Sequence, residues 1–311
     1  MKAVDSHLLT LLKKSSQFIV PIYQRVYSWQ ESECEQLWSD ILRAGVTDRM
    51  GAHFTGSIVY VARGQSTNTS AEPDLIIDGQ QRVTTVTLVL AALAQHLDTL
   101  PEGEREPWDG FSPKKIRNRY LLNDDEDGER QFKLVLSQGD RDALKAIVLG
   151  AEPDDDIPTR VTTNFQFFRN KFSDPNLDLA ALCRGLDKLV VVDVTLTRGV
   201  DNPQLVFEAM NSTGRKLSQA DLIRNYVLMD MPPKEQDALY TAYWRPMELE
   251  FVGSNDSQFD EFVRHYLTIK TGEIPRLGDI YDAFKAYSFQ FVTSGQSMDD
   301  LVIELRQYAK R

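Results

Sequence analysis

The chain has 311 residues and a formal net charge of −11 at pH 7, which argues against a generally basic surface for nucleic acid but not against a local basic groove. Its hydrophobic fraction of 42% is typical of a globular protein, so a large buried core is expected. Two widely separated cysteines, Cys34 and Cys183, match no metal-ligand spacing and favour a reduced, cytoplasmic location. No apolar run approaches the roughly 18 residues that a membrane span needs.

The first 18 residues predict a short amphipathic helix and no signal peptide, because Asp5 and His7 interrupt the apolar residues. Residues 18–20 predict a short strand, and the proline that follows disfavours helix before it. A helix is then expected from about Glu31. The last residues, LRQYAKR, lie inside a helical pattern without a stop signal, which suggests that the sequence is a fragment of a longer protein.

Residues 53–62 and 75–77 predict the two strands of a hairpin around a polar loop. From Val83 the apolar residues follow a helical spacing as far as Leu97, and a linker rich in proline, glycine and glutamate follows. Beyond it the sequence predicts a basic helical turn, an acidic loop and a short strand. Later elements are expected as helices at 140–149 and 163–172, a strand at 188–196, and helices at 203–210 and from Ser218 onward.

This order predicts an α+β fold, in which a small mixed sheet with helices is followed by a mainly helical region. Three segments are expected: an α/β region at 1–104, a mixed region completing the same domain at 105–230, and a helical region at 231–311.

A polar string, Asp-Gly-Gln-Gln-Arg, occupies the turn between the strand at 75–77 and the helix after it. A helix N-terminus presents unpaired N–H groups and a partial positive charge, so it suits a phosphate. Gly79 allows a ligand to approach the backbone closely, and Arg82 disfavours the helix unless an anion is bound there. Asp78 can hold Mg²⁺ or accept a hydrogen bond, while Gln80 and Gln81 can orient a water. The alternative is that Asp78 caps the helix and the glutamines are solvated.

A second motif, PIYQRVYSW at 21–29, also follows a strand and combines aromatic, amide and guanidinium groups. Tyrosine and tryptophan can stack on bases, and arginine can pair with phosphate or with a guanine edge. The other interpretation is a turn that anchors the core.

A third motif, FEAMNSTGRKLSQADLIRN at 207–225, surrounds a turn and the start of a helix with polar residues. Capping and turn chemistry accounts for part of it, since Ser218 and Asp221 have capping-box spacing. The densest basic cluster of the chain consists of Lys114, Lys115, Arg117 and Arg119. It can contact DNA phosphates or form a solvated helix face.

Several functional classes are excluded by what the sequence lacks. The four histidines are scattered and none stands at ligand spacing with cysteine or an acid, which excludes a recognisable zinc or Cys–His site. Neither the Gly-x-x-x-x-Gly-Lys-Ser/Thr string of P-loop proteins nor a His-Asn-His nuclease core is present.

The three motifs together resemble the N-terminal domain of GmrSD-type restriction proteins, once called domain of unknown function 262. They stand here as VPIYQRVYSW, IIDGQQRVTTV and VFEAMNSTGRKLSQADLIRNYVL, and the resemblance covers about residues 18–287. It extends to a member that senses phosphorothioate-modified DNA, although no residue separates that member from its relatives.

The resemblance implies a ParB/sulfiredoxin-like α/β domain whose strand–GxxR–helix turn binds a nucleotide, with Gly79 to Arg82 on that pattern. It implies a nucleoside triphosphate, GTP or ATP, with Mg²⁺ on Asp78, and double-stranded modified DNA and an HNH-type nuclease domain, in cis or in trans, as partners. A homo-oligomer is compatible with the family. The expected catalytic residues are Asp78, Gln80, Gln81 and Arg82. Gly79, Asn211 and Arg224 are expected to bind the nucleotide. The expected DNA-binding residues are Tyr23, Gln24, Arg25, Trp29, Lys114, Lys115 and Arg117.

Three functions follow as hypotheses. The first is a nucleoside triphosphatase that senses DNA modification and controls a nuclease. The second is a ParB-like, nucleotide-gated DNA-binding switch with negligible hydrolysis. The third is a domain that itself cleaves DNA, although no nuclease motif supports it.

Overall fold

The computed structural model describes residues 1–47, 51–62, 73–153, 159–211, 217–229, 231–251 and 257–310. By the clustering of its contacts the chain forms two compact units. The N-terminal unit comprises residues 1–21 and 26–202, and the C-terminal unit comprises residues 22–25 and 203–311. The short segment 22–25 therefore belongs to a different unit from the residues on either side of it.

The N-terminal unit contains one mixed six-stranded sheet in the order β1-β6-β3-β4-β2-β5. β1 pairs antiparallel with β6, β6 parallel with β3, and β3 antiparallel with β4, while β2 runs parallel to both β4 and β5. The strands are β1 (Lys2–His7), β2 (Phe18–Ile19), β3 (His53–Ala62), β4 (Asp74–Asp78), β5 (Leu134–Val135) and β6 (Leu189–Thr197).

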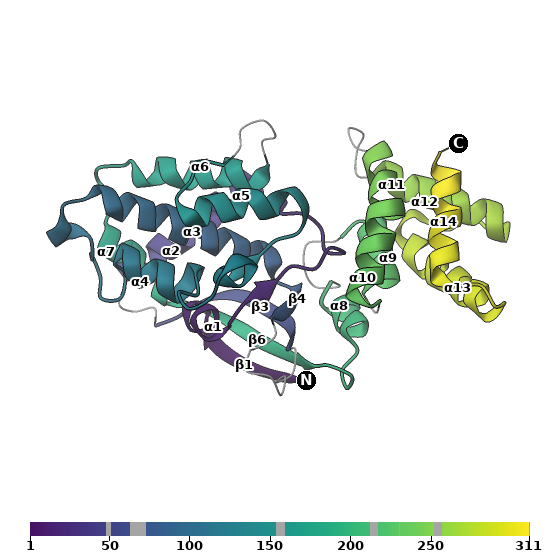
Figure 1. The fold of residues 1–311 in the computed structure, drawn as a ribbon, viewed down its shortest axis with the longest axis horizontal. Coiled ribbons are helices and arrows are strands. Elements are labelled where there is room, and N and C mark those ends of the chain that lie inside the picture. The colour runs from purple at the N-terminus through teal and green to yellow at the C-terminus, as the bar shows by residue number, and fades with distance from the viewer. Residues whose placement is uncertain are drawn as a thin grey trace. The chain divides into compact units, whose positions relative to one another are not determined.

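Helices of the same unit gather beside this sheet (Figure 1). Helix α3 is central among them, since it packs against α4, α5 and α6, while α2 packs against α7. The helices are α1 (Leu8–Lys14), α2 (Glu31–Val46), α3 (Gln80–Thr99), α4 (Pro113–Ile116) with a π-helical continuation (Arg117–Leu121), α5 (Gln138–Leu149), α6 (Arg160–Phe172) and α7 (Leu179–Asp187).

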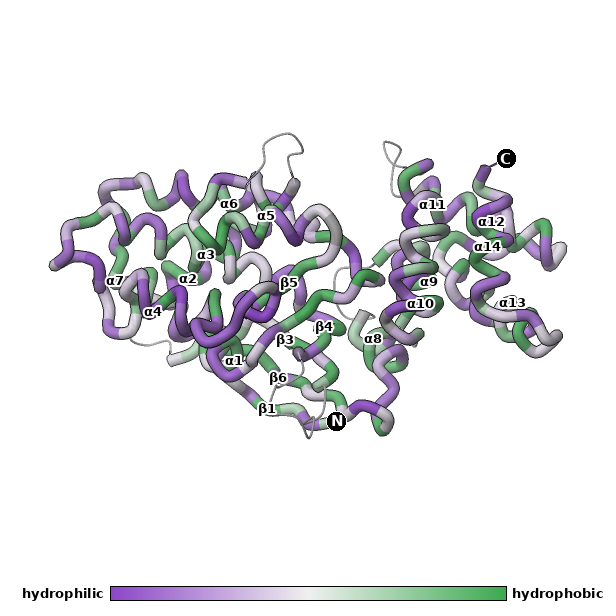
Figure 2. The backbone as a smooth tube through the Cα atoms, in the orientation of Figure 1, coloured by the Kyte–Doolittle hydropathy of each residue, from purple (hydrophilic) through white to green (hydrophobic). Residues whose placement is uncertain are grey.

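The core of this unit lies between the sheet and its helices. Figure 2 shows hydrophobic stretches in β3, β4 and β6, and the residues of α3 from Val83 to Ala94 are all buried. Such a helix, apolar on nearly every side, is expected at the centre of a helical layer. The turn at the N-terminus of α3 therefore adjoins a firmly packed helix.

The C-terminal unit is helical and has its own hydrophobic core around the buried Trp244, Tyr266 and Phe284. Its helices are α8 (Pro203–Asn211), α9 (Gln219–Leu228), α10 (Pro233–Leu239) with a π-helical continuation (Tyr240–Trp244), α11 (Arg245–Glu250), α12 (Ser257–Thr271), α13 (Ile280–Thr293) and α14 (Met298–Ala309).

The predicted α+β class, with a mixed sheet followed by a mainly helical region, is confirmed. The division into compact units lies at 202/203, whereas the sequence interpretation divided the chain after 104 and 230. Helices α8 and α9 contact each other, and α9 packs against α12 and α13, which explains why these elements belong with the C-terminal helices.

The predicted N-terminal helix is wrong in its first half. Residues Lys2–His7 form the edge strand β1, and the helix begins only at Leu8. β1 pairs with β6, whose residues lie more than 180 positions further along the chain. A local pattern cannot show such a partner.

Candidate functional site

The Asp-Gly-Gln-Gln-Arg motif lies between β4 and α3, where Gly79 joins the two elements. Its φ of +89° lies in the left-handed region, which favours glycine. A Cβ built on Gly79 would stand 2.7 Å from the carbonyl oxygen of Ser57 in β3. The turn therefore packs backbone against backbone, and no larger residue fits it.

The N-cap residue of α3 offers no side-chain cap to the first turn. It is Gly79, and no side-chain cap hydrogen bond is formed there. The interpretation of Asp78 as the helix cap is therefore wrong. An uncapped N-terminus with a partial positive charge favours an anion.

Arg82 extends from the first turn of α3 toward β3. Its Nη1 donates a hydrogen bond to the Ser57 carbonyl at 2.7 Å, and its Nη2 lies over Gly56, where a Cβ would stand only 2.6 Å away. β3 shifts its register with β6 between Phe54 and Ser57, and Gly56 has a φ of +109°. The bulge and the absent side chain together form a cradle for the guanidinium.

Burial lowers the pKa of Arg82, and the nearby negative charge of Asp78 partly offsets this. Even so, no salt bridge within 4.0 Å joins Arg82 to any acid in the described part of the chain. Among these residues Ser57 supplies its one hydrogen-bond acceptor. A partly desolvated cation with unused donors at an uncapped helix start favours binding of an anion.

The side chain of Gln81 was predicted to orient a water, but in the structure it is bonded to protein groups. Its Oε1 accepts hydrogen bonds from the backbone N–H groups of Ser28 and Trp29, at 2.8 and 3.2 Å, and its Nε2 donates to the Val26 carbonyl at 3.3 Å. Gln80 is also buried, with 7% of its surface exposed. The amide of Gln81 therefore holds a neighbouring segment and is not free to orient a water in this conformation.

This neighbouring segment, residues 26–29, is called the strap below. Side chains of two further helices hold it: Asp140 accepts from the Tyr27 N–H at 2.8 Å, and Asn164 donates to the Trp29 carbonyl at 2.9 Å and to the Tyr27 hydroxyl at 3.0 Å. The Tyr27 hydroxyl also meets Thr85 Oγ1 at 2.7 Å. The strap lacks regular secondary structure, yet side chains hold its backbone.

Sequence reasoning missed Asp140 and Asn164. Asn164 is 1% exposed and lies among the buried apolar residues of α6, so a polar residue on a predicted core face was the available signal. Burial raises the pKa of Asp140 to about 6, although its hydrogen bond from Tyr27 acts in the opposite direction. Asp140 is therefore a buried carboxyl that responds to pH near neutrality.

The residues preceding the strap belong to the C-terminal unit. Tyr23 is 2% exposed and packs in the core of that unit, and Gln24 is 3% exposed. Trp29, within the N-terminal unit, packs partly buried against its core. The contacts of Tyr23, Gln24, Arg25 and Trp29 with DNA stay predictions, and Tyr23 in particular is not presented to a base in this conformation.

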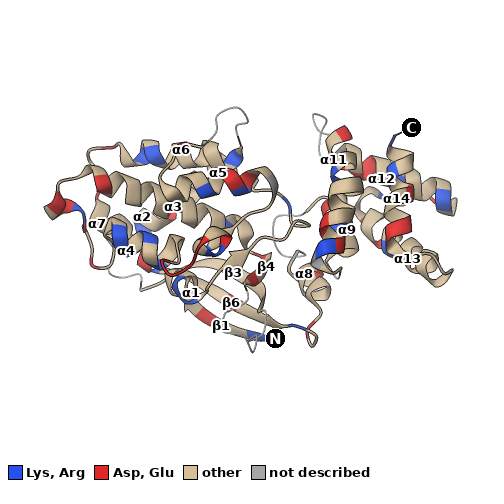
Figure 3. Cartoon of the chain, viewed as in Figure 1, with Lys and Arg blue, Asp and Glu red and all other residues tan. Residues whose placement is uncertain are grey.

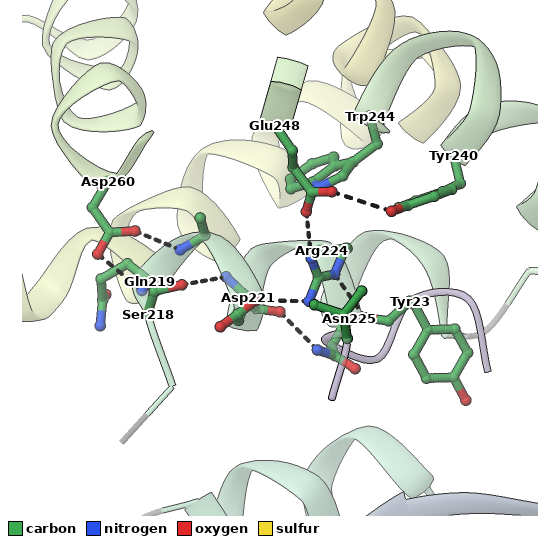
Figure 4. A network of polar contacts seen from close by, with 12 residues as sticks. Tyr23, Ser218, Gln219, Asp221, Arg224, Asn225, Tyr240, Trp244, Glu248 and Asp260 are labelled. Atoms are coloured by element: carbon green, nitrogen blue, oxygen red, sulfur yellow. Dashed lines mark hydrogen bonds and ion pairs between the residues drawn. The ribbon is translucent and has the colours of Figure 1, made fainter. Parts of the chain in front are cut away.

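Arg224 of α9 lies in a buried ionic network (Figure 4). Its guanidinium bonds Glu248 and Asp221, and its Nε donates to the Tyr23 carbonyl at 2.7 Å. Glu248 also accepts from Trp244 at 2.9 Å and from Tyr240 at 3.2 Å.

The carboxylates of Glu248 and Asp221 raise the pKa of Arg224 against the opposing effect of burial. Arg224 is thus satisfied by protein groups, so its predicted role with nucleotide requires another conformation. Asp221 pairs with Arg224, while the Ser218 hydroxyl accepts from the Asp221 N–H as predicted for the start of the helix. The predicted nucleotide contact of Asn211 stays untested, because its side chain lies outside the described residues, as do residues 212–216.

The basic cluster lies on α4 and its continuation, and Figure 3 shows acidic residues elsewhere on the same unit. Lys115 forms an ion pair with Glu106, and Arg117 with Asp98. Lys114 is exposed. Acidic neighbours therefore offset two of the three predicted phosphate-binding cations.

Metal ligands are sparse across the ranges that the structure describes. No group of three or more histidine, cysteine, aspartate or glutamate side chains is arranged to hold an ion there. Mg²⁺ is commonly bound through one or two carboxylates together with substrate phosphates, so the single carboxylate of Asp78 fits an Mg²⁺ ion only if the ion arrives with phosphate. In the same ranges no helix is long and apolar enough to cross a membrane.

Comparison with known proteins identifies one family. The model described as "GmrSD restriction endonuclease, N-terminal domain" matches residues 8–228, which include all three motifs. No curated protein matches the chain. The resemblance inferred from the motifs is confirmed at the level of the family.

Proposed function

Because the chain belongs to the family of GmrSD restriction endonuclease N-terminal domains and so is a component of a restriction system, we propose that it binds and hydrolyses a nucleoside triphosphate in response to modified DNA. In this proposal it serves defence against phage in the cytoplasm and controls an HNH-type nuclease domain, supplied in cis or in trans. It acts on double-stranded DNA, and phosphorothioate is one candidate for the modification. Assembly as a homo-oligomer is compatible with this role.

One observation carries the nucleotide site: the Arg82 guanidinium sits in a glycine cradle beside an uncapped helix start, and Ser57 is its one hydrogen-bond acceptor in the described structure. An unbalanced cation in the first turn of a helix, together with the helix N-terminus, favours a phosphate group. Asp78 stands nearby and forms no ion pair with Arg82 within 4.0 Å across the described ranges. Both charges are therefore available to a ligand.

Each residue then has a definite role. The backbone N–H groups of the first turn of α3 and the Arg82 guanidinium hold the phosphates, and Gly79 keeps the backbone within reach of them. Asp78 holds Mg²⁺, which neutralises phosphate charge and polarises the phosphoryl group when it is bound. Arg82 stabilises the negative charge that accumulates on the phosphoryl oxygens during transfer to water.

The second candidate, a nucleotide-gated switch with negligible hydrolysis, is favoured by the position of Gln81. Hydrolysis needs a group that orients the attacking water. The Gln81 amide makes three hydrogen bonds to the backbone of the strap, and Gln80 is almost fully buried. A site built in this way binds a triphosphate but positions water poorly, unless DNA binding releases one of the two amides.

Phosphate release from purified protein separates the two candidates. It is measured with GTP and ATP, each with Mg²⁺, without DNA and with unmodified or phosphorothioate-modified duplexes. Hydrolysis that modified DNA accelerates supports the sensor, whereas nucleotide binding without release in any mixture supports the switch. Asp78→Asn should raise the Mg²⁺ concentration needed for half-maximal activity, and Asp125→Asn, an exposed carboxylate of a distant loop, is the control. The absence of nucleotide binding would contradict both candidates.

A further inference from the structure

The backbone of the strap is held in place by side chains of neighbouring helices. Five of its backbone groups are bound by side chains: the Val26 carbonyl and the Ser28 and Trp29 N–H groups by Gln81, the Tyr27 N–H by Asp140, and the Trp29 carbonyl by Asn164. Three helices supply these side chains, and Gln81 lies in the first turn of α3, beside the proposed nucleotide site. A displacement of that turn is therefore passed directly to the strap.

The chain continues from the strap into the other unit. Residues 22–25 belong to the C-terminal unit, and within it Arg224 fixes the Tyr23 carbonyl at 2.7 Å (Figure 4). Only Gln24 and Arg25 separate Tyr23 from the first residue of the strap. The Cα atoms of Tyr23 and Val26 are three residue steps apart and can separate by at most about 11 Å, so the link limits how far one anchored segment moves without the other.

We propose that Gln81 and Arg224 are positioning residues at the two ends of a tether, residues 23–29, through which occupancy of the nucleotide site changes the stability of helix α9. This regulatory inference rests on the proposed nucleotide site. It assigns to Gln81 a mechanical role in place of the predicted water-orienting one.

Nucleotide binding would reach α9 in three steps. Phosphate binding draws the first turn of α3 toward the ligand, because its N–H groups and Arg82 contact the anion. Gln81 moves with its helix and displaces the strap through three hydrogen bonds to the strap backbone. The displacement reaches Tyr23 and then Arg224, whose guanidinium is also bonded to Asp221 and Glu248. Helices α9 and α11 therefore respond together.

Hydrogen–deuterium exchange of the whole chain tests this inference. Exchange is followed with and without a β,γ-imido analogue of GTP, and of ATP, in the presence of Mg²⁺. The variant is an insertion of two glycines between Arg25 and Val26, which lengthens the link and keeps both anchors. The control is the same insertion between Glu126 and Asp127, in an exposed loop. Thermal unfolding confirms that both proteins fold.

In the wild-type chain and the control, the analogue should slow exchange in the first turn of α3, in the strap and in α9, by about fivefold or more in α9. The inserted variant should keep the protection of α3 and lose that of α9. Protection of α9 that survives the insertion would overturn the tether, and so would wild-type protection of α3 without any in α9. If neither analogue protects α3, the nucleotide site itself fails.

A second pair of variants keeps the test informative if the insertion disturbs folding. Gln81→Met removes every hydrogen bond from the Gln81 amide to the strap at nearly constant volume and should abolish the response of α9 to the analogue. Gln95→Met is the matched control, because Gln95 lies on the same helix and donates to the Ile147 carbonyl at 3.1 Å. An α9 response that is equal in both variants would contradict the role of Gln81.

Discussion

The Arg82 guanidinium occupies the space that a side chain on Gly56 would fill, since a Cβ there would stand 2.6 Å from Nη2. The position of the arginine thus depends on a glycine 26 positions earlier in the chain. A second glycine, Gly79, brings the motif itself against β3. The functional turn therefore depends on two close approaches of backbone as well as on its charged residues.

Substitution of these glycines should separate their roles. Gly79→Ala should lower the free energy of unfolding by about 1–3 kcal/mol, because a Cβ would meet the Ser57 carbonyl in a left-handed conformation. Gly56→Ala should displace Arg82 and weaken nucleotide binding even where the fold survives. Gly103→Ala, where a Cβ meets no atom within 4 Å, is the control. Urea unfolding measures stability, and a Gly79 variant as stable as the control would contradict this close packing against β3.

The buried carboxyl of Asp140 should make stability depend on pH. Its folded-state pKa of about 6 lies above the value of about 3.9 expected in the unfolded chain. The stability that it contributes is therefore complete below about pH 4 and is lost as the pH rises through about 6. Asp140→Asn should remove this dependence and stabilise the protein by about 1–3 kcal/mol at pH 7.5.

Thermal unfolding between pH 4.5 and 8 measures this effect. The control is Asp142→Asn, which changes an exposed carboxylate on the same helix. Equal pH dependence of the Asp140 variant and the wild type would show that Asp140 does not titrate in this range.

Removal of one carboxylate from the network around Arg224 should lower the free energy of unfolding substantially. Glu248→Ala removes a carboxylate that accepts hydrogen bonds from Arg224, Trp244 and Tyr240, and it leaves a buried cation under-compensated. We expect a loss of about 3 kcal/mol in the free energy of unfolding. Glu235→Ala, at an exposed position of α10, should change it by less than about 0.5 kcal/mol.

A double variant, Arg224→Met with Glu248→Leu, should recover part of that stability, because the buried cation is removed together with Glu248 and only the partly exposed Asp221 loses its partner. Chemical denaturation measures the free energy of unfolding of each variant. A Glu248→Ala protein as stable as the Glu235→Ala protein would show that the network contributes no stability.

DNA binding through the basic cluster should depend unequally on the three cations that are predicted to bind phosphates. Lys115 and Arg117 already have acidic partners, whereas Lys114 is exposed. Lys114→Gln should reduce the slope of log affinity against log salt by about one unit, and Lys115→Gln by less. Lys234→Gln, an exposed change in the C-terminal unit, is the control. Slopes of Lys114→Gln and Lys115→Gln that both equal the slope of the control would remove this cluster from the DNA interface.

Local patterns predicted the elements around the site well. The β-rich residues at 53–62, the apolar run at 75–77 and the helical spacing from Val83 correspond to β3, β4 and α3. The position of Gly79 in the turn between β4 and α3 was also predicted. The anion beside Arg82, inferred because a cation in the first turn of a helix opposes the helix dipole, stays a prediction.

What the sequence did not predict depends on distant partners. The strand β1 requires β6, and the strap requires Asp140 and Asn164, which stand 113 and 135 positions away from their backbone partners. Gln81 and Arg224 looked like ligand groups because both are polar residues in motifs. Their actual partners, the strap and Glu248, become visible only when the chain is folded.

The proposed function depends above all on Arg82 and the uncapped start of α3 holding the phosphates of a nucleotide. The equilibrium affinity of the wild type, Arg82→Ala and Arg105→Ala for the β,γ-imido analogue of GTP or ATP with Mg²⁺, measured by titration calorimetry, tests this directly. Arg105 is a fair control, because it also bonds a backbone carbonyl, that of Leu100 at 2.8 Å, near the other end of α3. We predict affinity about 10- to 150-fold weaker for Arg82→Ala, with native circular dichroism, and unchanged affinity for Arg105→Ala. Wild-type affinity in the folded Arg82→Ala protein would contradict the proposed site.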